Sequence, residues 1–201
     1  MSDQSEQPTG LFCLEGEWSD SLTDAKSVRP LLDLLASTGS ARYIHRRIAT
    51  STEFFHQLDK WLEGGCEGDL DDYLTLMIAA HGLVGEVEFD DRSVSLEDLG
   101  KHFDGRAGDC FVYFGSCATL SAPDSELLRF RARTGARAVF GYTHDVDWLT
   151  SAAFEALLIH EMTNSANGAQ VFSRLHARYG SMVEELGLTV VTSSGVRRAH
   201  A

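Results

Sequence analysis

The sequence has no long apolar run and is short of basic residues. Among its 201 residues, 17 are basic and 30 acidic, which gives a formal net charge of −13. No apolar stretch approaches the roughly 20 residues that a membrane helix requires, so no membrane partner is expected. Lysines and arginines are not gathered into a patch that could follow a phosphate backbone. Nucleic acid is therefore not expected as a partner either.

Cysteine is also scarce, and the four cysteines lack the paired spacing of a disulfide framework or a zinc site. The first ten residues are polar, unlike the charged and then apolar start of a secretory signal. We therefore expect free thiols in a reducing, cytoplasmic compartment, with no metal and no other cofactor. Cys13 and Cys110 lie in apolar runs and are expected in the core, whereas Cys66 lies in a glycine-rich segment and is expected to be exposed.

Short apolar runs alternate with segments of helical spacing along the chain. The apolar runs predict buried strands at residues 11–14, 73–80 and 110–114, and further strands are predicted at residues 43–48, 136–140 and 188–192. Helical spacing predicts helices at residues 27–36, 51–62, 95–103, 124–134, 148–162 and 169–179. Residues 85–89 alternate like a half-exposed ribbon and predict a hairpin. This order indicates an α/β fold, a three-layer αβα sandwich with a mostly parallel central sheet.

The length and the 43% hydrophobic content suit one domain with a large core. We expect a flexible N-terminal lead over residues 1–9, a single domain over residues 10–195 and a polar tail over residues 196–201. The strand at residues 188–192 can pair across a twofold axis if it stands at an exposed sheet edge. The expected state is therefore a monomer or a homodimer.

Two strand ends carry residues that suit nucleophilic catalysis. His81 and Gly82 follow one apolar run, and Cys117 follows another. In an open parallel sheet ligands bind at the carboxyl ends of the strands, so an imidazole and a thiol on neighbouring strands would face one cleft. There Cys117 would attack a carbonyl as its thiolate and His81 would accept the proton. The N–H groups of Gly82 and Cys117 would form an oxyanion hole.

These two segments resemble the signatures of the caspase-like clan of cysteine peptidases, which includes caspases, metacaspases, legumain, separase and the bacterial CHAT proteins. An apolar block followed by His-Gly stands at residues 76–82, and an apolar block, a small residue and Cys stand at residues 111–117. Residues 136–142 and 148–154 are similar to the segments that come after the nucleophile in CHAT-like proteins. The chain also looks close to a family of small, uncharacterised bacterial proteins. The resemblance implies a caspase-hemoglobinase-like fold, a cysteine endopeptidase with catalytic His81 and Cys117, and a protein or peptide substrate.

The sequence departs from the clan around the nucleophile. Caspases have Gln-Ala-Cys-Arg-Gly where this chain has Gly-Ser-Cys-Ala-Thr at residues 115–119, and metacaspases have Asp where this chain has Gly115. The specificity pocket of caspases therefore does not carry over. Two alternatives stay open: a catalytically silent caspase-like interaction module, and a glutaminase-type cysteine hydrolase whose base would be His144 or His160. Thr119 stands where the glutaminase-type turn needs glycine.

Acidic residues follow the first and fifth strands, at the same rim as the dyad. They favour a basic substrate side chain, with Asp147 as the ion-pair partner and the neighbouring Trp148 stacking on a guanidinium. The alternative is that these acidic residues, together with Asp20 after the first strand, only form solvent-exposed loops. The candidate substrate-binding residues are Glu15, Glu17, Ser116, His144, Asp145, Asp147 and Trp148.

A helix fills most of residues 118–135, between Cys117 and the next strand, so little loop remains there for proteolytic processing. We therefore expect the active form to be one uncut chain.

Overall fold

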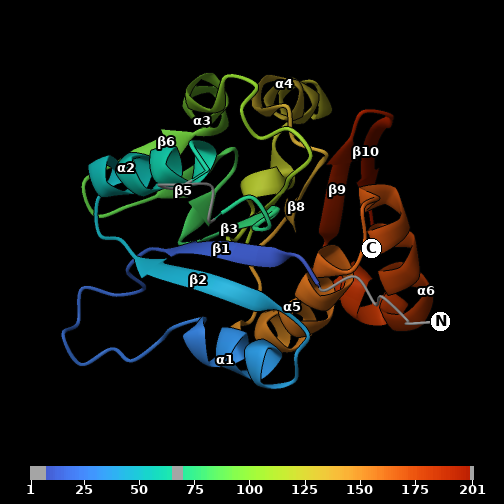
Figure 1. The fold of residues 1–201 in the computed structure, drawn as a ribbon, viewed down its shortest axis with the longest axis horizontal. Helices are drawn as coiled ribbons and strands as arrows, with labels where there is room; N and C mark the ends of the chain where they lie inside the picture. Colours follow the sequence, from blue (N-terminus) through green and yellow to red (C-terminus); the bar gives the residue numbers. More distant parts are fainter. Residues whose placement is uncertain (1–7, 65–69, 200–201) are drawn as a thin grey trace.

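The computed structural model describes residues 8–64 and 70–199, and they form an α/β sandwich (Figure 1). The central seven-stranded sheet contains β1 (Gly10–Glu15), β2 (Arg42–Arg47), β3 (Thr75–Ala79), β7 (Phe111–Phe114), β8 (Ala138–Tyr142), β9 (Leu188–Thr192) and β10 (Gly195–Arg198). Their order across the sheet is β10-β9-β8-β7-β3-β1-β2. The strands from β8 to β2 are parallel, and β9 and β10 are antiparallel to their neighbours. The predicted fold class is confirmed.

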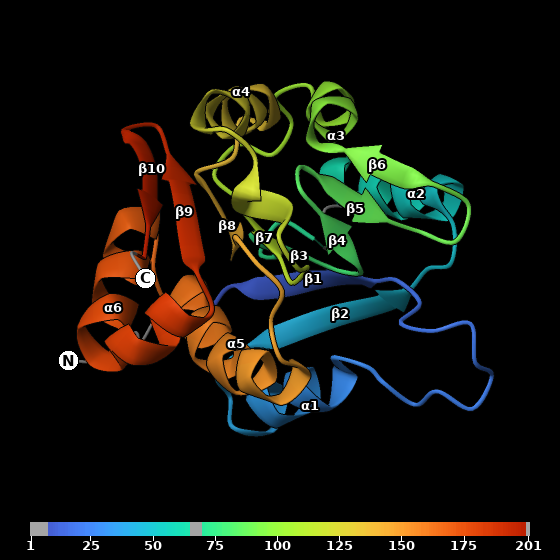
Figure 2. The ribbon, with the colours of Figure 1, turned by 180° about the vertical axis from the view of Figure 1, so that it is seen from behind.

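Helices cover both faces of this sheet, as Figures 1 and 2 show from opposite sides. One face is covered by α1 (Arg29–Ser37), α5 (Trp148–Thr163) and α6 (Gly168–Glu185). The other face is covered by α2 (Ser51–Leu62), α3 (Leu96–Phe103) and α4 (Asp124–Thr134). Alternate residues of a strand serve the two faces: Leu11 and Cys13 pack toward the first group of helices, and Phe12 and Leu14 toward the second. This double burial explains why the central strands read as unbroken apolar runs.

The hairpin expected at residues 85–89 is part of a larger feature. A second, antiparallel sheet has three strands, β4 (Gly82–Leu83), β5 (Glu86–Glu88) and β6 (Ser93–Ser95). The prediction missed its two outer strands because they are only two and three residues long. Since β4 begins one residue after His81, this small sheet borders the carboxyl end of β3.

The C-terminal predictions need correction. Residues 196–198, expected in a polar tail, belong to β10, which pairs with β9. Its Val196 packs on the core and its Arg198 forms an ion pair with Asp124, so a mostly polar segment still gains enough contacts to be a strand. Consequently β9 lies inside the sheet between β8 and β10 and is not the exposed edge strand that pairing across a dimer would require. Helix α6 also continues to Glu185, past the predicted end at Tyr179, where its backbone departs from helical geometry.

Other expectations concern the N-terminus and the cysteines. Residues 1–7 of the expected flexible lead and Cys66 lie outside the described residues. Thr9, at the end of that lead, donates a backbone hydrogen bond to Thr163 (3.0 Å). Cys13 is fully buried as predicted, whereas Cys110 is only partly buried, and both are free thiols. None of the described helices combines the length and the apolar character needed to cross a membrane.

Candidate active site

The two predicted catalytic residues stand at matching positions just past the ends of two adjacent strands. Strand β3 pairs directly with β7, and Ile78 is the register partner of Phe114. His81 and Cys117 each stand three residues after that pair. Because the strands are parallel, both side chains emerge at the same edge of the sheet, at the carboxyl ends.

The turns that carry these residues touch each other through their backbones. A β-carbon placed on Gly82 would lie 2.4 Å from the carbonyl oxygen of Cys117 and 2.8 Å from the β-carbon of Ser116. Only glycine permits so close an approach. Ser116, a predicted substrate-binding residue, is itself buried, and its hydroxyl donates to the carbonyl oxygen of Ile78 (3.3 Å). It therefore joins the β7 end to the β3 end, and it does not line the cavity described below.

The chain turns sharply after Cys117. Ala118 has a left-handed backbone (φ 52°), and its N–H donates to the carbonyl oxygen of His144 (3.2 Å). A short 3-10 helix, η1 (Thr119–Ser121), begins directly afterward. A left-handed alanine is strained by about 1 kcal/mol, a cost that surrounding contacts must offset. The strained turn presents Cys117 at the tip of the strand end.

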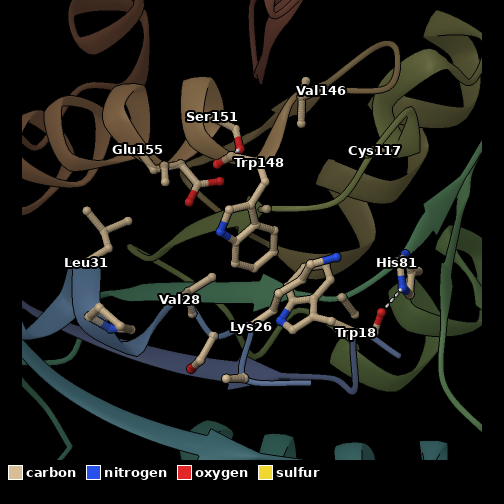
Figure 3. A pocket seen from close by; sticks show the side chains of 16 residues that line it. Trp18, Lys26, Val28, Leu31, His81, Cys117, Val146, Trp148, Ser151 and Glu155 are labelled. Carbon is tan, nitrogen blue, oxygen red and sulfur yellow. Dashed lines mark hydrogen bonds between the residues drawn. The ribbon is translucent and has the colours of Figure 1, made fainter. Parts of the chain in front are cut away.

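A cavity of about 440 Å³ is lined by both His81 and Cys117. Figure 3 shows the side chains that line this cavity, with Trp18 and Trp148 at the centre of the view. The two indole rings meet edge to face, with their centroids 4.8 Å apart. The remaining lining comes from the segment before α1, the start of α1 and the first turns of α5, together with residues at the strand ends: Ala25, Lys26, Ser27, Val28, Pro30, Leu31, Ala80, Gly115, Val146, Ser151, Ala152 and Glu155. Most of these side chains are apolar, as is typical of a small-molecule or side-chain pocket.

The imidazole of His81 is held from outside the sheet. Its Nε2–H donates to the backbone carbonyl oxygen of Trp18 (3.1 Å), the bond drawn in Figure 3. The Trp18 ring also packs edge-on against the imidazole, with the ring centroids 5.4 Å apart. Since a carbonyl oxygen only accepts, Nε2 carries the hydrogen, and in the neutral ring Nδ1 is the free acceptor. His81 is thus held in the tautomer that can take a proton through Nδ1.

The Gly82 N–H is available as a donor. In the β4–β5 ladder, the Glu88 N–H donates to the His81 carbonyl oxygen (2.9 Å), which makes His81 and Glu88 a hydrogen-bonded pair. Hydrogen-bonded and non-hydrogen-bonded pairs alternate along an antiparallel ladder, so the next pair, Gly82 with Val87, leaves its N–H groups outside the ladder. The ladder therefore leaves the Gly82 N–H free for the predicted oxyanion role.

The cavity contains a buried carboxyl group, that of Glu155 on α5. The Tyr113 hydroxyl donates to its Oε1 (2.7 Å), and the Tyr142 hydroxyl lies 2.9 Å from that of Tyr113. Burial raises the pKa of Glu155 to about 7, although the hydrogen bonds from the two tyrosines oppose the increase. A β-carbon on Gly115 would be 3.4 Å from Oε1, so the glycine leaves room for the carboxyl. The lining also includes one cation, the exposed Lys26.

The predicted acidic substrate-binding residues have other partners. Glu15 is fully buried and accepts hydrogen bonds from four groups of the protein. Half-buried Glu17 forms an ion pair with Arg47 (2.7 Å). Asp147 caps the N-terminus of α5, because its Oδ1 accepts from the N–H groups of Leu149 (3.1 Å) and Thr150 (2.9 Å). The expected use of Asp147 as an ion-pair partner for a substrate is therefore not supported.

The remaining predicted residues divide between the cavity and its surroundings. Trp148 lines the cavity. Asp145 is exposed and is not part of the lining. The His144 imidazole Nε2–H donates to the Glu185 carbonyl oxygen (2.6 Å), away from the cavity lining, and His160 does not contribute to that lining either. Neither histidine therefore stands where a glutaminase-type base for Cys117 would be needed. Among the described residues, no three His, Cys, Asp or Glu side chains are grouped as metal ligands.

The comparisons with known proteins fit this geometry. Residues 8–191 match a family described as a family of unknown function, DUF6642. The chain belongs to this family. No curated protein matches the sequence. A solved structure that it resembles is that of a secreted C11 cysteine protease from Bacteroides thetaiotaomicron, in complex with an irreversible peptide inhibitor. The two share 9% sequence identity with a TM-score of 0.56, over 93% of this chain and 67% of that one.

At this level of identity the likeness shows the fold, and it confirms that this DUF6642 protein has a caspase-like fold.

Two residues that line the cavity, Trp18 and Glu155, were not predicted from the sequence. A signal existed for Glu155, because it is an acidic residue in a helix otherwise rich in Ala and Leu. Trp18 had no such signal, since it lies in an irregular segment and uses its backbone carbonyl to contact His81.

Proposed function

We propose that this protein is a cysteine endopeptidase in which Cys117 is the nucleophile and His81 the general acid and base. One observation carries the proposal: a single cavity is lined by both side chains, and the imidazole of His81 is held there by the Trp18 carbonyl oxygen. A pair in which one residue can be activated and the other is oriented by a third group is the general arrangement of activated nucleophiles.

The proposed reaction uses two residues that line the same cavity, His81 and Cys117. His81 Nδ1 takes the proton from the Cys117 thiol, and the thiolate attacks the peptide carbonyl carbon. The N–H groups of Gly82 and Cys117 donate to the resulting oxyanion. When the C–N bond breaks, the leaving amine takes the proton from Nδ1. A water molecule then hydrolyses the thioester, giving its proton back through His81, and the thiol is restored.

We further propose a preference for a basic substrate side chain, with Glu155 in place of Asp147 as its partner. Glu155 is buried whereas Lys26 is exposed, so water screens the lysine far more than the carboxylate. The rings of Trp18 and Trp148 offer faces on which a guanidinium can stack. A second cavity, of about 260 Å³, borders His81 and includes four acidic residues in its lining, Glu17, Asp20, Glu88 and Asp90. The acidic groups of both cavities would repel an acidic substrate side chain.

The substrate class, the compartment and the oligomeric state that we propose are those expected from the sequence. The proposed substrate is a protein or peptide, the proposed compartment is the cytoplasm, where free thiols persist, and the proposed state is a monomer or homodimer. The three described cysteines, Cys13, Cys110 and Cys117, are all free thiols, as that compartment requires.

A peptide library that varies the residue before the scissile bond tests this proposal. Wild-type protein should cleave after Arg or Lys, and Cys117→Ala and His81→Ala should each remove cleavage. Glu155→Gln keeps the shape of the side chain and should lower kcat/KM for basic peptides by at least about tenfold, the loss of one charge-assisted contact. Cleavage that survives in Cys117→Ala would refute the nucleophile. Cleavage after small apolar residues, unchanged in Glu155→Gln, would refute the basic preference alone.

A further inference from the structure

Glu15, the last residue of β1, is a fully buried carboxylate with an unusually complete set of partners. Its Oε1 accepts from the indole N–H of Trp18 and from the backbone N–H of Val28, both at 2.7 Å. Its Oε2 accepts from the Ser27 hydroxyl (2.7 Å) and from the imidazole Nε2–H of His45 (2.6 Å). Burial alone would raise the pKa of Glu15, but these four hydrogen bonds outweigh it and hold the pKa below its ordinary value. The group is therefore retained as a carboxylate.

Three of these partners belong to the two ends of one segment. Residues 16–28 connect β1 to α1, and we call them the strap. Trp18 lies near the beginning of the strap, and Ser27 and Val28 lie at its end. Much of the strap is irregular and exposed, so it lacks a sheet ladder or helix to fix its path. Glu15 closes the strap into a loop by bonding both ends, and His45 ties the carboxylate to β2.

The strap carries the only partner that the described hydrogen bonds give to the His81 imidazole. Its Trp18 carbonyl oxygen accepts from His81 Nε2–H (3.1 Å), while the Trp18 indole N–H is held by Glu15. The same residue is thus fixed through its side chain and contacts the dyad through its backbone. Lys26, Ser27 and Val28 of the strap also line the cavity.

We propose that Glu15 is a positioning residue for His81, acting through Trp18. The proposal rests on the proposed function, because it assumes that His81 works with Cys117. Glu15 does not line the cavity. Its effect is to hold the Trp18 carbonyl where it fixes the ring orientation and tautomer of the base.

Two substitutions test this role at different strengths. Glu15→Gln replaces an oxygen that accepts two hydrogen bonds by an NH2 group that only donates, so two of the four donors lose their acceptor. Trp18→Phe is milder, because it keeps an aromatic wall and the backbone carbonyl but removes the indole N–H that Glu15 holds. Asp24→Asn is the matched control: Asp24 is on the same strap, and its carboxylate accepts from the Lys26 N–H (3.2 Å) without contacting Trp18 or His81. We expect the control to behave as wild type.

The measurement is the rate at which iodoacetamide alkylates Cys117 at about pH 6, where an unassisted thiol is almost fully protonated. His81→Ala defines the rate without the base. We expect the His81-dependent part of the alkylation rate to be about tenfold lower in Glu15→Gln than in wild type, because the base is no longer held in its orientation. The rate in Trp18→Phe should lie between the rates in Glu15→Gln and in wild type. Peptide hydrolysis should show the loss mainly in kcat rather than in KM. Because partial unfolding also lowers the apparent kcat, each rate is divided by the fraction of folded protein in that variant, and the loss in Glu15→Gln should persist after this correction.

The outcomes separate this proposal from the proposed function. If His81→Ala reacts as wild type does, no dyad operates, and both proposals fall. If His81→Ala slows alkylation while Glu15→Gln and Trp18→Phe do not, only the positioning role of Glu15 is overturned. Should Glu15→Gln fail to fold, Trp18→Phe decides alone: a wild-type alkylation rate in that variant overturns the proposal, and an intermediate rate supports it.

Discussion

Gly82 lies so close to Cys117 that a β-carbon on the glycine would be 2.4 Å from the cysteine carbonyl oxygen. The clash is with backbone, which cannot rotate away as a side chain can. Gly82→Ala should therefore separate the two turns and displace His81 from Cys117. A displacement of about 1 Å in such a site lowers rates by about 100-fold, and we expect at least that loss in peptide hydrolysis.

A matched control for Gly82→Ala is Gly180→Ala. A β-carbon at Gly180, in α6, meets nothing within 4 Å. We expect that variant to keep wild-type activity. If Gly82→Ala were equally active, the two turns would not need to be in contact, and the role of Gly82 in the site would be wrong.

Glu155 makes stability depend on pH in a direction that can be checked. Its pKa in the folded protein is about 7, above the ordinary value of 4.5, so between these values the folded state binds more protons than the unfolded state. Stability is then lost as the pH rises through this window, and the loss is complete above it. The full effect is on the order of 3 kcal/mol.

The Glu155→Gln variant carries no ionisable group at this position and should escape this loss. We expect it to unfold at nearly the same denaturant concentration as wild type near pH 4.5, and to be clearly more stable than wild type near pH 8. Denaturant titrations at both pH values measure the difference. A difference that does not change with pH would show that Glu155 titrates normally in the folded protein.

The three described cysteines should differ sharply in reactivity. Burial raises the pKa of Cys110 to about 11 and raises that of Cys13 well above its ordinary value. Because only the thiolate reacts, both should be nearly inert near neutral pH, whereas Cys117 lines an open cavity beside His81. In a Cys66→Ser background, mass mapping after brief exposure to iodoacetamide should find the label on Cys117. Equal labelling of Cys110 would contradict this account.

The active form should be one uncut chain. Of residues 118–135, η1 and α4 occupy most, and α4 packs on the core through Leu127 and Phe130. Proteases cut exposed, extended loops, and little such loop is left between Cys117 and β8. Mass spectrometry of the active, inhibitor-labelled protein should therefore give the intact mass. A mature form cleaved between Cys117 and β8 would refute this prediction.

Much of the fold was predictable because the central strands are buried on both faces and are therefore unbroken apolar runs. The ends of the apolar runs also predicted that His81 and Cys117 would share one cavity, since a parallel sheet brings its carboxyl ends to one edge. Strand β10 was missed because its residues are mostly polar, and its pairing with β9 depends on tertiary contacts such as that of Arg198 with Asp124.

The specificity residues were harder to predict because charge alone does not show which partner a carboxylate has. Asp147 precedes the predicted helix directly, which is the usual place of an N-cap, so its capping role was readable from the sequence. The partners of Glu15 were not readable in this way. His45 is 30 residues away and reaches Glu15 only because β1 and β2 pair in register.

The central claim is that Cys117 is a nucleophile activated by His81, and covalent labelling by a peptidyl acyloxymethylketone tests it most directly. This electrophile reacts slowly with ordinary thiols and rapidly with a cysteine in a working catalytic site. We predict one label per chain on Cys117 in wild type, a rate lower by at least about 100-fold in His81→Ala, and no label in Cys117→Ala. If wild-type Cys117 resists this reagent while iodoacetamide still alkylates it, the protein is not a cysteine peptidase.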